Sequence, residues 1–208
     1  MTTASEAAAE PLPDRRRARR QDTKDEIVAA AWALVREKGL AGLAMRDLGA
    51  RVGMKAQSIY SYFESKNDIY DAMFREAYLD FAGTVVDGTH TEPGDVAAAH
   101  RAAHAFFDFC TSDPVRYQLL FQRTIPDFVP SEESYAVALS VLDSLREHFG
   151  ALGITDPEAA DLWTAVLTGL TDQQISNDPG GDRWKRIVDR AVDMVIREIA
   201  PHLVDETS

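Results

Sequence analysis

The chain has 208 residues, of which 45% are hydrophobic, and it carries a formal net charge of −12 at pH 7. This length and composition can bury a substantial core and exclude general disorder, while the single cysteine, Cys110, excludes an intrachain disulfide and a zinc site built from several cysteines. No apolar run reaches membrane-spanning length and the N-terminus has no signal-peptide core, so we expect a cytoplasmic protein that does not enter a membrane.

The two ends of the chain differ strongly in charge. Residues 1–66 hold 12 Lys or Arg and 9 Asp or Glu, a net charge of +3, whereas residues 67–208 hold 10 Lys or Arg and 25 Asp or Glu, a net charge of −15. A basic end on an acidic body is typical of a protein that offers only one end to a polyanion.

Residues 1–22 are predicted to form a disordered basic tail, because they show no apolar periodicity. The tail contains the run RRRARR, from Arg15 to Arg20. Such a run either lies along DNA phosphates or is simply solvated, and the sequence leaves both alternatives open.

Helical periodicity and capping residues then predict an all-α chain. In the N-terminal third, Thr23 and Glu26 form a capping box, Gly53 allows a sharp turn, and Ser65 caps a further helix. The helices predicted there span 23–38, 45–52, 55–63 and 66–86. Those predicted in the rest of the chain span 94–111, 114–123, 132–150, 156–176 and 182–200. We expect two folded domains, at residues 23–66 and 67–208.

The two short helices around Gly53 have the layout of a helix-turn-helix. The second helix of that motif enters the major groove of DNA, so it needs apolar anchors inside and small or polar groups outside. Ile59 and Phe63, four residues apart, are predicted to face inward. The side chains predicted to face outward are Lys55, Gln57, Ser58 and Ser61.

The stretch GLAGLAMRDLGARVGMKAQSIYSYFESKNDIYDAMF, residues 39–74, closely resembles the DNA-binding domain of the tetracycline-repressor (TetR) family of transcriptional regulators. The preceding helix, TKDEIVAAAWALVREKG, resembles the family as well, so the resemblance covers residues 23–75 or so. It implies an N-terminal three-helix DNA-binding domain and a helical C-terminal domain for ligand binding and dimerisation.

The resemblance also implies roles for individual side chains. Tyr60, Tyr62 and Lys66 are expected to contact DNA phosphates. Base contacts are expected from the second and third helices, with hydrogen bonds from polar groups and contact with a thymine methyl from Ala56. The polar candidates for base contacts are Arg46, Lys55, Gln57 and Ser58, and Ser61 is a further DNA-binding candidate.

Two positions depart from the family pattern. Ala44 stands where the family usually has a Ser or Thr that caps the second helix and touches phosphate. Gly49 replaces a usual Ala and is expected to loosen this helix slightly.

The last two predicted helices carry apolar faces that could form a four-helix dimer interface or simply pack within one subunit. On the first helix the face comprises Leu162, Ala165, Val166, Gly169 and Leu170. On the second it comprises Trp184, Ile187, Val188, Ala191, Val192, Val195 and Ile199.

The middle of the chain is rich in aromatic residues, which indicates either a plain aromatic core or a cavity for an apolar effector. The candidate ligand-binding residues are His104, Phe107, Asp108, Cys110, Tyr117, Phe121, Tyr135 and Trp163. His100, His104 and Asp108 share one helical stripe that could hold a metal, but the sequence shows no further ligand. Polar lining of a pocket or of the surface is therefore the favoured interpretation, and no metal or cofactor is predicted.

The sequence thus predicts a homodimeric repressor that binds an inverted-repeat operator in double-stranded DNA and is released by a small, apolar effector. No phosphate-binding loop, nucleophile elbow or catalytic dyad is present, so no enzyme is expected. The alternatives are a ligand-binding or adaptor protein of the same fold without DNA binding, or an all-helical enzyme.

Overall fold

The computed structural model describes residues 12–86 and 95–205, and every regular element in these ranges is helical. The predicted all-α class is therefore confirmed. The chain divides into two compact units, one ending at Tyr70 and the other beginning at Asp71. This division falls inside helix α4 (Lys66–Phe81), a few residues beyond the predicted boundary at residue 66.

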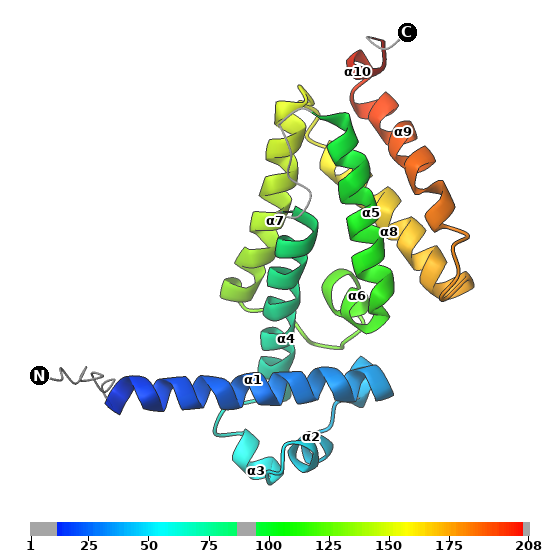
Figure 1. The fold of residues 1–208 in the computed structure, drawn as a ribbon. Helices are drawn as coiled ribbons and strands as arrows, with labels where there is room; N and C mark the ends of the chain where they lie inside the picture. Colours follow the sequence, from blue (N-terminus) through cyan, green and yellow to red (C-terminus); the bar gives the residue numbers. More distant parts are fainter. Residues whose placement is uncertain (1–11, 87–94, 206–208) are drawn as a thin grey trace, which may run out of the picture. The chain divides into compact units, whose positions relative to one another are not determined.

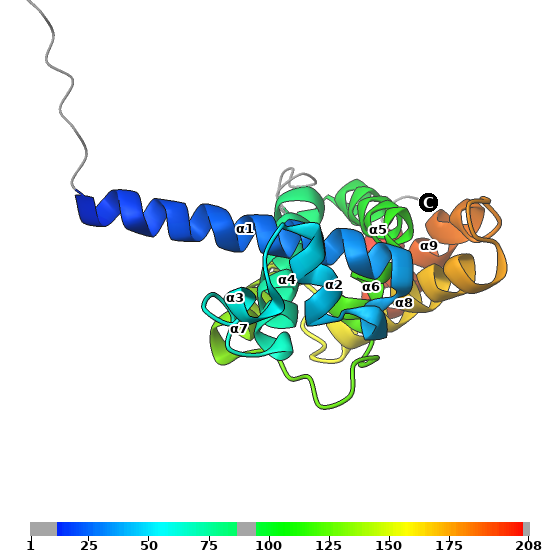
Figure 2. The same ribbon diagram turned by 90° about the horizontal axis from the view of Figure 1, so that it is seen from below.

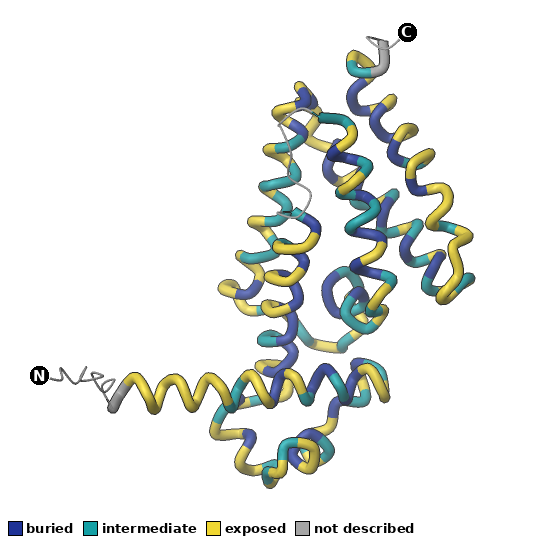
Figure 3. The backbone as a smooth tube through the Cα atoms, viewed as in Figure 1, coloured by how far each residue is buried: buried dark blue, intermediate teal, exposed yellow. Residues whose placement is uncertain are grey.

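The first unit is a small helical domain with its own apolar core (Figures 1 and 3). Besides the start of α4, its elements are α1 (Leu12–Lys38), a 3₁₀ turn η1 (Leu40–Gly42), α2 (Met45–Arg51) and α3 (Ala56–Ile59). The core takes at least one fully buried side chain from each α-helix: Ile27, Val35, Leu48, Ile59 and Ile69.

Helix α1 begins at Leu12, so the predicted helix start at Thr23 is wrong. The Thr23 hydroxyl donates to the carbonyl oxygen of Arg19 at 2.9 Å, one turn earlier in the same helix. Residues 12–22 are thus helical and not disordered as predicted, and residues 1–11 lie outside the described residues. Apolar periodicity reports only burial, whereas Arg, Ala and Gln favour a helix even where no side chain is buried.

Two ion pairs hold α2 against the end of α1. Lys38 Nζ lies 2.7 Å from Asp47 Oδ2, and Arg51 Nη2 lies 2.7 Å from Glu37 Oε1. The hydrogen bond and charge of Lys38 lower the pKa of Asp47. Because these groups are largely exposed, the pairs orient the helices and add little stability.

The second unit packs its helices around α5 (Val96–Ser112), which contacts α6 (Pro114–Phe121), α8 (Ala159–Asn177) and α9 (Val188–Ile199). Helix α7 (Glu132–Ala151) packs on α8 and on a π-helical turn, η2 (Ala82–Val86), that follows α4. A 3₁₀ turn η4 (Lys185–Ile187) precedes α9, and a short α10 (His202–Asp205) follows it. Figure 1 shows α5 between α7 and α9.

Side-chain caps define several helix starts in this unit. Asp95 caps α5, Asp113 caps α6 ahead of Pro114, and Ser131 caps α7. Helix α8 begins at Ala159 and not at residue 156 as predicted, because the preceding residues form a turn that Asp156 stabilises by accepting from the backbone N–H of Glu158.

One carboxylate fastens the start of α7 to α4. Asp71 accepts hydrogen bonds from the Ser131 backbone N–H at 2.7 Å, the Ser131 hydroxyl at 2.9 Å and the Ser134 hydroxyl at 2.8 Å. Ser134 is buried. Three donors on one charged acceptor make this a firm junction between the two helices.

The hydroxyl of Tyr70 allows the stability of the first unit to be tested. This buried hydroxyl donates to the carbonyl oxygen of Leu40 at 2.5 Å and so ties α4 to η1. We expect Tyr70→Phe to lower the free energy of unfolding by about 0.5–1.5 kcal/mol, because one hydrogen bond is lost while the Leu40 carbonyl still accepts from the Leu43 backbone N–H. Urea denaturation followed by circular dichroism measures this loss. Tyr60→Phe removes an exposed hydroxyl and serves as the control; equal stability of the two variants would contradict the prediction.

Candidate DNA-binding surface and apolar cavity

The first candidate site is the helix-turn-helix formed by α2 and α3. Gly53, with a φ of 67°, makes the turn between them, and the Met54 backbone N–H donates to the Gly49 carbonyl oxygen at 2.8 Å. A Cβ added at Gly49 would lie 2.7 Å from the Met54 carbonyl oxygen. Gly49 therefore allows α2 and the turn to approach more closely than an Ala would. The sequence predicted only that this glycine loosens α2, and this packing role was not predicted.

Helix α3 is shorter than predicted. Regular α-helix ends at Ile59, and the chain continues to Phe63 as hydrogen-bonded turns, with the Tyr62 N–H donating to the Ile59 carbonyl oxygen at 2.8 Å. We call residues 55–63 the recognition segment. Its two apolar anchors, Ile59 and Phe63, are buried as predicted.

The remaining side chains of the recognition segment form an outward face. Lys55, Gln57, Ser58, Tyr60 and Ser61 are exposed, with 43% of Tyr60 accessible. Ala56 and Tyr62 are half-buried at its edges. This face is composed of small and polar groups, which suits contact with base edges and phosphates. The role of each residue in DNA binding stays a prediction.

The flanking candidates lie on α2 and at the start of α4. The Arg46 side chain is 92% exposed and lies 3.5 Å from Asp47. Lys66 is exposed at the first residue of α4, with its Nζ 5.6 Å from the centre of the Tyr70 ring. The predicted cap of that helix is present, because the Ser65 hydroxyl accepts from the Asp68 N–H at 3.2 Å. Ala44 provides no side-chain cap to α2.

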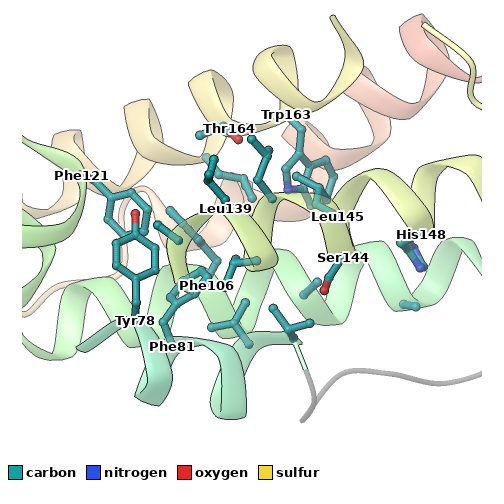
Figure 4. Close-up of a pocket in the computed structure, with 18 of the residues that line it drawn as sticks. Tyr78, Phe81, Phe106, Phe121, Leu139, Ser144, Leu145, His148, Trp163 and Thr164 are labelled. Carbon is teal, nitrogen blue, oxygen red and sulfur yellow. The ribbon is translucent and has the colours of Figure 1, made fainter. Parts of the chain in front are cut away.

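The second candidate site is an apolar cavity of about 290 Å³ within the second unit. Side chains from α4, α5, α6, α7 and α8 line it, together with η2, and Figure 4 shows them pointing inward. Among its described lining residues none is Asp, Glu, Lys or Arg. Its polar groups come from the side chains of Tyr78, Tyr135, Ser144, His148, Trp163 and Thr164.

Three of the predicted ligand-binding residues line this cavity: Phe121, Tyr135 and Trp163. The other five have different surroundings in the described structure. Phe107 and Cys110 belong to the buried core, and the Tyr117 hydroxyl donates to the Thr168 carbonyl oxygen at 3.2 Å. Burial raises the pKa of the Cys110 thiol, which makes it a poor nucleophile.

His104 and Asp108 instead tie α5 to α9 and to the turn before it. Asp189 Oδ1 lies 2.9 Å from His104 Nε2 and 2.9 Å from His100 Nδ1, and these contacts lower the pKa of Asp189. Asp108 pairs with Lys185 at 2.5 Å. No set of three His, Cys, Asp or Glu side chains in residues 12–86 and 95–205 is arranged to hold a metal ion.

The sequence prediction missed much of the cavity wall. The polar groups on α7 and α8, Ser144, His148 and Thr164, were not identified, and neither was the aliphatic run of α7 that includes Leu139 and Leu142. The only signal in the sequence was the apolar stripe of α7, which does not show what the stripe faces.

The predicted dimer helices divide into core and surface. On α9, Val188, Val192, Val195 and Ile199 are buried within the subunit, so at these positions the alternative of packing within one subunit holds. Met194 on α9 is 58% exposed and Leu162 on α8 is 39% exposed. Gly169 on α8 is exposed, and a Cβ added there would meet no atom within 4 Å. An outward surface with apolar and small residues therefore remains on both helices.

None of the helices in the described ranges is long and apolar enough to cross a bilayer.

Comparison with known proteins identifies similar regulators. Residues 27–73 match the family described as bacterial regulatory proteins, tetR family. The HTH-type transcriptional regulator Rv1816 of Mycobacterium tuberculosis is 27% identical over 181 residues, which cover 79% of this chain and 75% of that protein.

Two solved structures have a similar fold. The multidrug binding protein EbrR, complexed with imidazole, aligns with a TM-score of 0.65 and 23% identity over 86% of this chain and 90% of that one. The transcriptional regulator FadR from Bacillus subtilis, in complex with stearoyl-CoA, aligns with a TM-score of 0.65 and 15% identity over 82% of this chain and 96% of that one.

The cavity makes a testable prediction about ligand charge. Uncharged N-phenyl-1-naphthylamine is expected to bind at least about tenfold more tightly than 8-anilino-1-naphthalenesulfonate, because the described cavity wall has no Lys or Arg to pair with a buried sulfonate. Fluorescence titration measures both dyes. Ala138→Trp fills the cavity and should abolish binding, whereas Ala136→Trp, at an exposed position of the same helix, should not. Equal binding of the two dyes, or equal effects of the two variants, would contradict this description of the site.

Proposed function

The chain belongs to the TetR family of transcriptional regulators, and we propose that it is a cytoplasmic, homodimeric repressor that leaves a palindromic operator when a small apolar effector binds. The observation that carries the DNA-binding part is the recognition segment, whose anchors Ile59 and Phe63 are buried while its polar side chains face solvent. This segment lies in the part of the chain with net positive charge, so the acidic remainder disfavours other approaches of DNA.

Dimerisation follows from the need for specificity. A single recognition segment covers too few base pairs to select one site in a genome, so two segments must act together. The exposed residues of α8 and α9, among them Leu162, Gly169 and Met194, support a dimer surface on these helices.

The cavity supports control by an effector. An effector changes DNA affinity only if it binds the DNA-competent and incompetent conformations differently. Helix α4 suits this coupling, because it begins directly after the recognition segment and its later residues Tyr78 and Phe81 line the cavity. A coupling free energy of about 1–3 kcal/mol lowers operator affinity by roughly 5- to 150-fold.

The chemistry of the cavity indicates the class of effector. Its wall is apolar and uncharged, and the few hydroxyl and imidazole groups can orient one or two polar atoms. The similar FadR structure contains stearoyl-CoA, which carries a long apolar chain, and EbrR is a multidrug binding protein; both support an effector with a large apolar part for this chain.

Two alternatives are distinguished by simple measurements. An adaptor of the same fold would bind the effector but would show no salt-dependent binding to duplex DNA. An all-helical enzyme would turn over a substrate, and the outward polar face of the recognition segment would then have no role.

The DNA contacts are tested on the duplex that the protein selects from a random pool. Gln57→Ala is expected to relax preference at one or two base positions, at a cost of about 1–3 kcal/mol if the contact is bidentate. Lys66→Ala should weaken binding to all duplexes alike and reduce the slope of log K against log salt by about 0.9 per subunit, because each subunit then neutralises one phosphate fewer. Fluorescence anisotropy at several salt concentrations separates the two effects. If neither variant changes binding, α3 is not the recognition helix.

The dimer is tested by two substitutions on the exposed surface. Gly169→Arg and Met194→Glu should each yield a folded monomer with much weaker operator binding, since both positions face solvent in the subunit. Val129→Glu, at a position that is 80% exposed on the α6–α7 loop, is the control. Analytical ultracentrifugation gives the oligomeric state, and the half-sites should be centred about 34–36 Å apart or a multiple of that. A wild-type protein that sediments as a monomer at micromolar concentration would refute the proposal.

A further inference from the structure

The first turns of α1 form a basic helical extension with no core of its own. Every residue from Asp14 to Asp22 is exposed, and the segment holds five arginines against two aspartates. Figure 3 shows this part of α1 as a continuous exposed helix. We call residues 14–22 the arginine extension.

Contacts within the first unit join the arginine extension to the recognition segment. Arg20 Nη2 donates to the Ser61 carbonyl oxygen at 2.5 Å, and its guanidinium carbon lies 5.0 Å from the centre of the Tyr62 ring. One turn later, Lys24 Nζ lies 5.2 Å from the centre of the Phe63 ring. The side of α1 that carries Arg20 and Lys24 therefore faces the end of the recognition segment.

Helical geometry divides the remaining arginines between two sides of α1. At about 100° per residue, Arg16 and Arg17 lie roughly 40° and 60° to either side of the direction of Arg20, one turn nearer the N-terminus. Arg15 and Arg19 lie roughly 140° and 100° from that direction, on a different side of the helix. In Figures 1 and 2 the first turns of α1 extend beyond α3.

From this arrangement we propose that Arg16 and Arg17 bind DNA phosphates immediately outside the half-site that the recognition segment contacts. The proposal rests on the DNA-binding function proposed above. The rise of about 1.5 Å per residue carries the chain roughly 6 Å from Arg20 to Arg16, and duplex DNA presents one phosphate charge per about 1.7 Å of its axis. The planar guanidinium fork suits phosphate oxygens better than a point charge does.

The position of the phosphates follows from the contacts of Arg20. Its partners Ser61 and Tyr62 belong to the end of the recognition segment, so the arginine extension continues that edge of the DNA-binding surface. Arg16 and Arg17 lie at the outer end of that edge, beyond Arg20, and contact phosphates and not base edges. Their contribution is affinity and a longer footprint, without sequence preference.

The experiment compares two double variants that remove the same charge from different sides of one helix. Arg16→Gln with Arg17→Gln removes the proposed contacts, and Arg15→Gln with Arg19→Gln is the matched control. Gln keeps a helix propensity close to that of Arg, and circular dichroism confirms that the helix persists. Operator binding is measured from low to high salt with the selected duplex extended by random sequence on both sides.

The slope of log K against log salt should fall by about 0.9 for each phosphate that the variant no longer neutralises, and so by roughly 1.8 per subunit in R16Q/R17Q. R15Q/R19Q should show less than half of this decrease, since it changes only the long-range field. On a duplex trimmed to the outer ends of the inverted repeat, wild type and R16Q/R17Q should bind alike.

Equal slopes for the two double variants on the extended duplex would overturn the proposal, and so would a difference that persists on the trimmed duplex. In both cases the wild type still binds its operator, so the proposed regulator function stands. A wild-type chain that binds no duplex overturns both.

Discussion

The recognition segment has to be held in place by other parts of the domain, because a helix of four residues is not stable in water. Forming the first helical turn fixes several backbone angles for a single hydrogen bond, and a short helix never recovers that cost internally. Here the position of α3 depends on burying Ile59 and Phe63 and on the tight passage of the turn past Gly49. The two ion pairs between α1 and α2 fix the other half of the motif. The polar face of the recognition segment is therefore exposed because the buried anchors and the turn past Gly49 fix the orientation of the segment.

In the second unit, by contrast, the packed helices leave a cavity unfilled. The aromatic rings there contact one another edge to face, with Phe81 5.8 Å from Phe106 and 5.7 Å from Phe121 between ring centres. Such contacts fix the rings while leaving the cavity between the helices open. The Asp71 carboxylate holds the start of α7 on α4, the two helices that carry Tyr135 and Tyr78 to the cavity wall.

Sequence patterns predicted the parts of this structure that depend on local chemistry. The helix-turn-helix layout followed from the two short helices around Gly53 and from the spacing of Ile59 and Phe63, which act within a few residues, and its assignment to DNA binding followed from the family resemblance. The start of α1 was missed because an exposed helix leaves no apolar pattern, and Thr23 resembled a cap that the helix does not need.

The cavity could be predicted only in outline for a related reason. Aromatic content indicated an apolar middle region, but which rings face a cavity and which face a neighbouring helix depends on the packing of five helices. His104 and Asp108 are the clearest example, since both have partners in the segment around α9, and Asp189 follows His104 by 85 residues in the sequence. The same limit applies to α9, whose apolar stripe is typical of an interface but packs into the core of its own subunit.

The loop between α6 and α7 is anchored at both ends, and this has a consequence for evolution and for engineering. Gln122 donates to Asp172 at 2.9 Å at one end, and Ser131 is held by Asp71 at the other. Because the ends are fixed by their own hydrogen bonds, the exposed part of the loop can lengthen, shorten or change sequence while the flanking helices keep their positions. Phe128 is the exception, since its ring packs against Phe74 of α4 at 6.4 Å between ring centres. Related chains are free to diverge here, and a peptide tag or reporter inserted near the exposed Val129 has the best chance of being carried without loss of the fold.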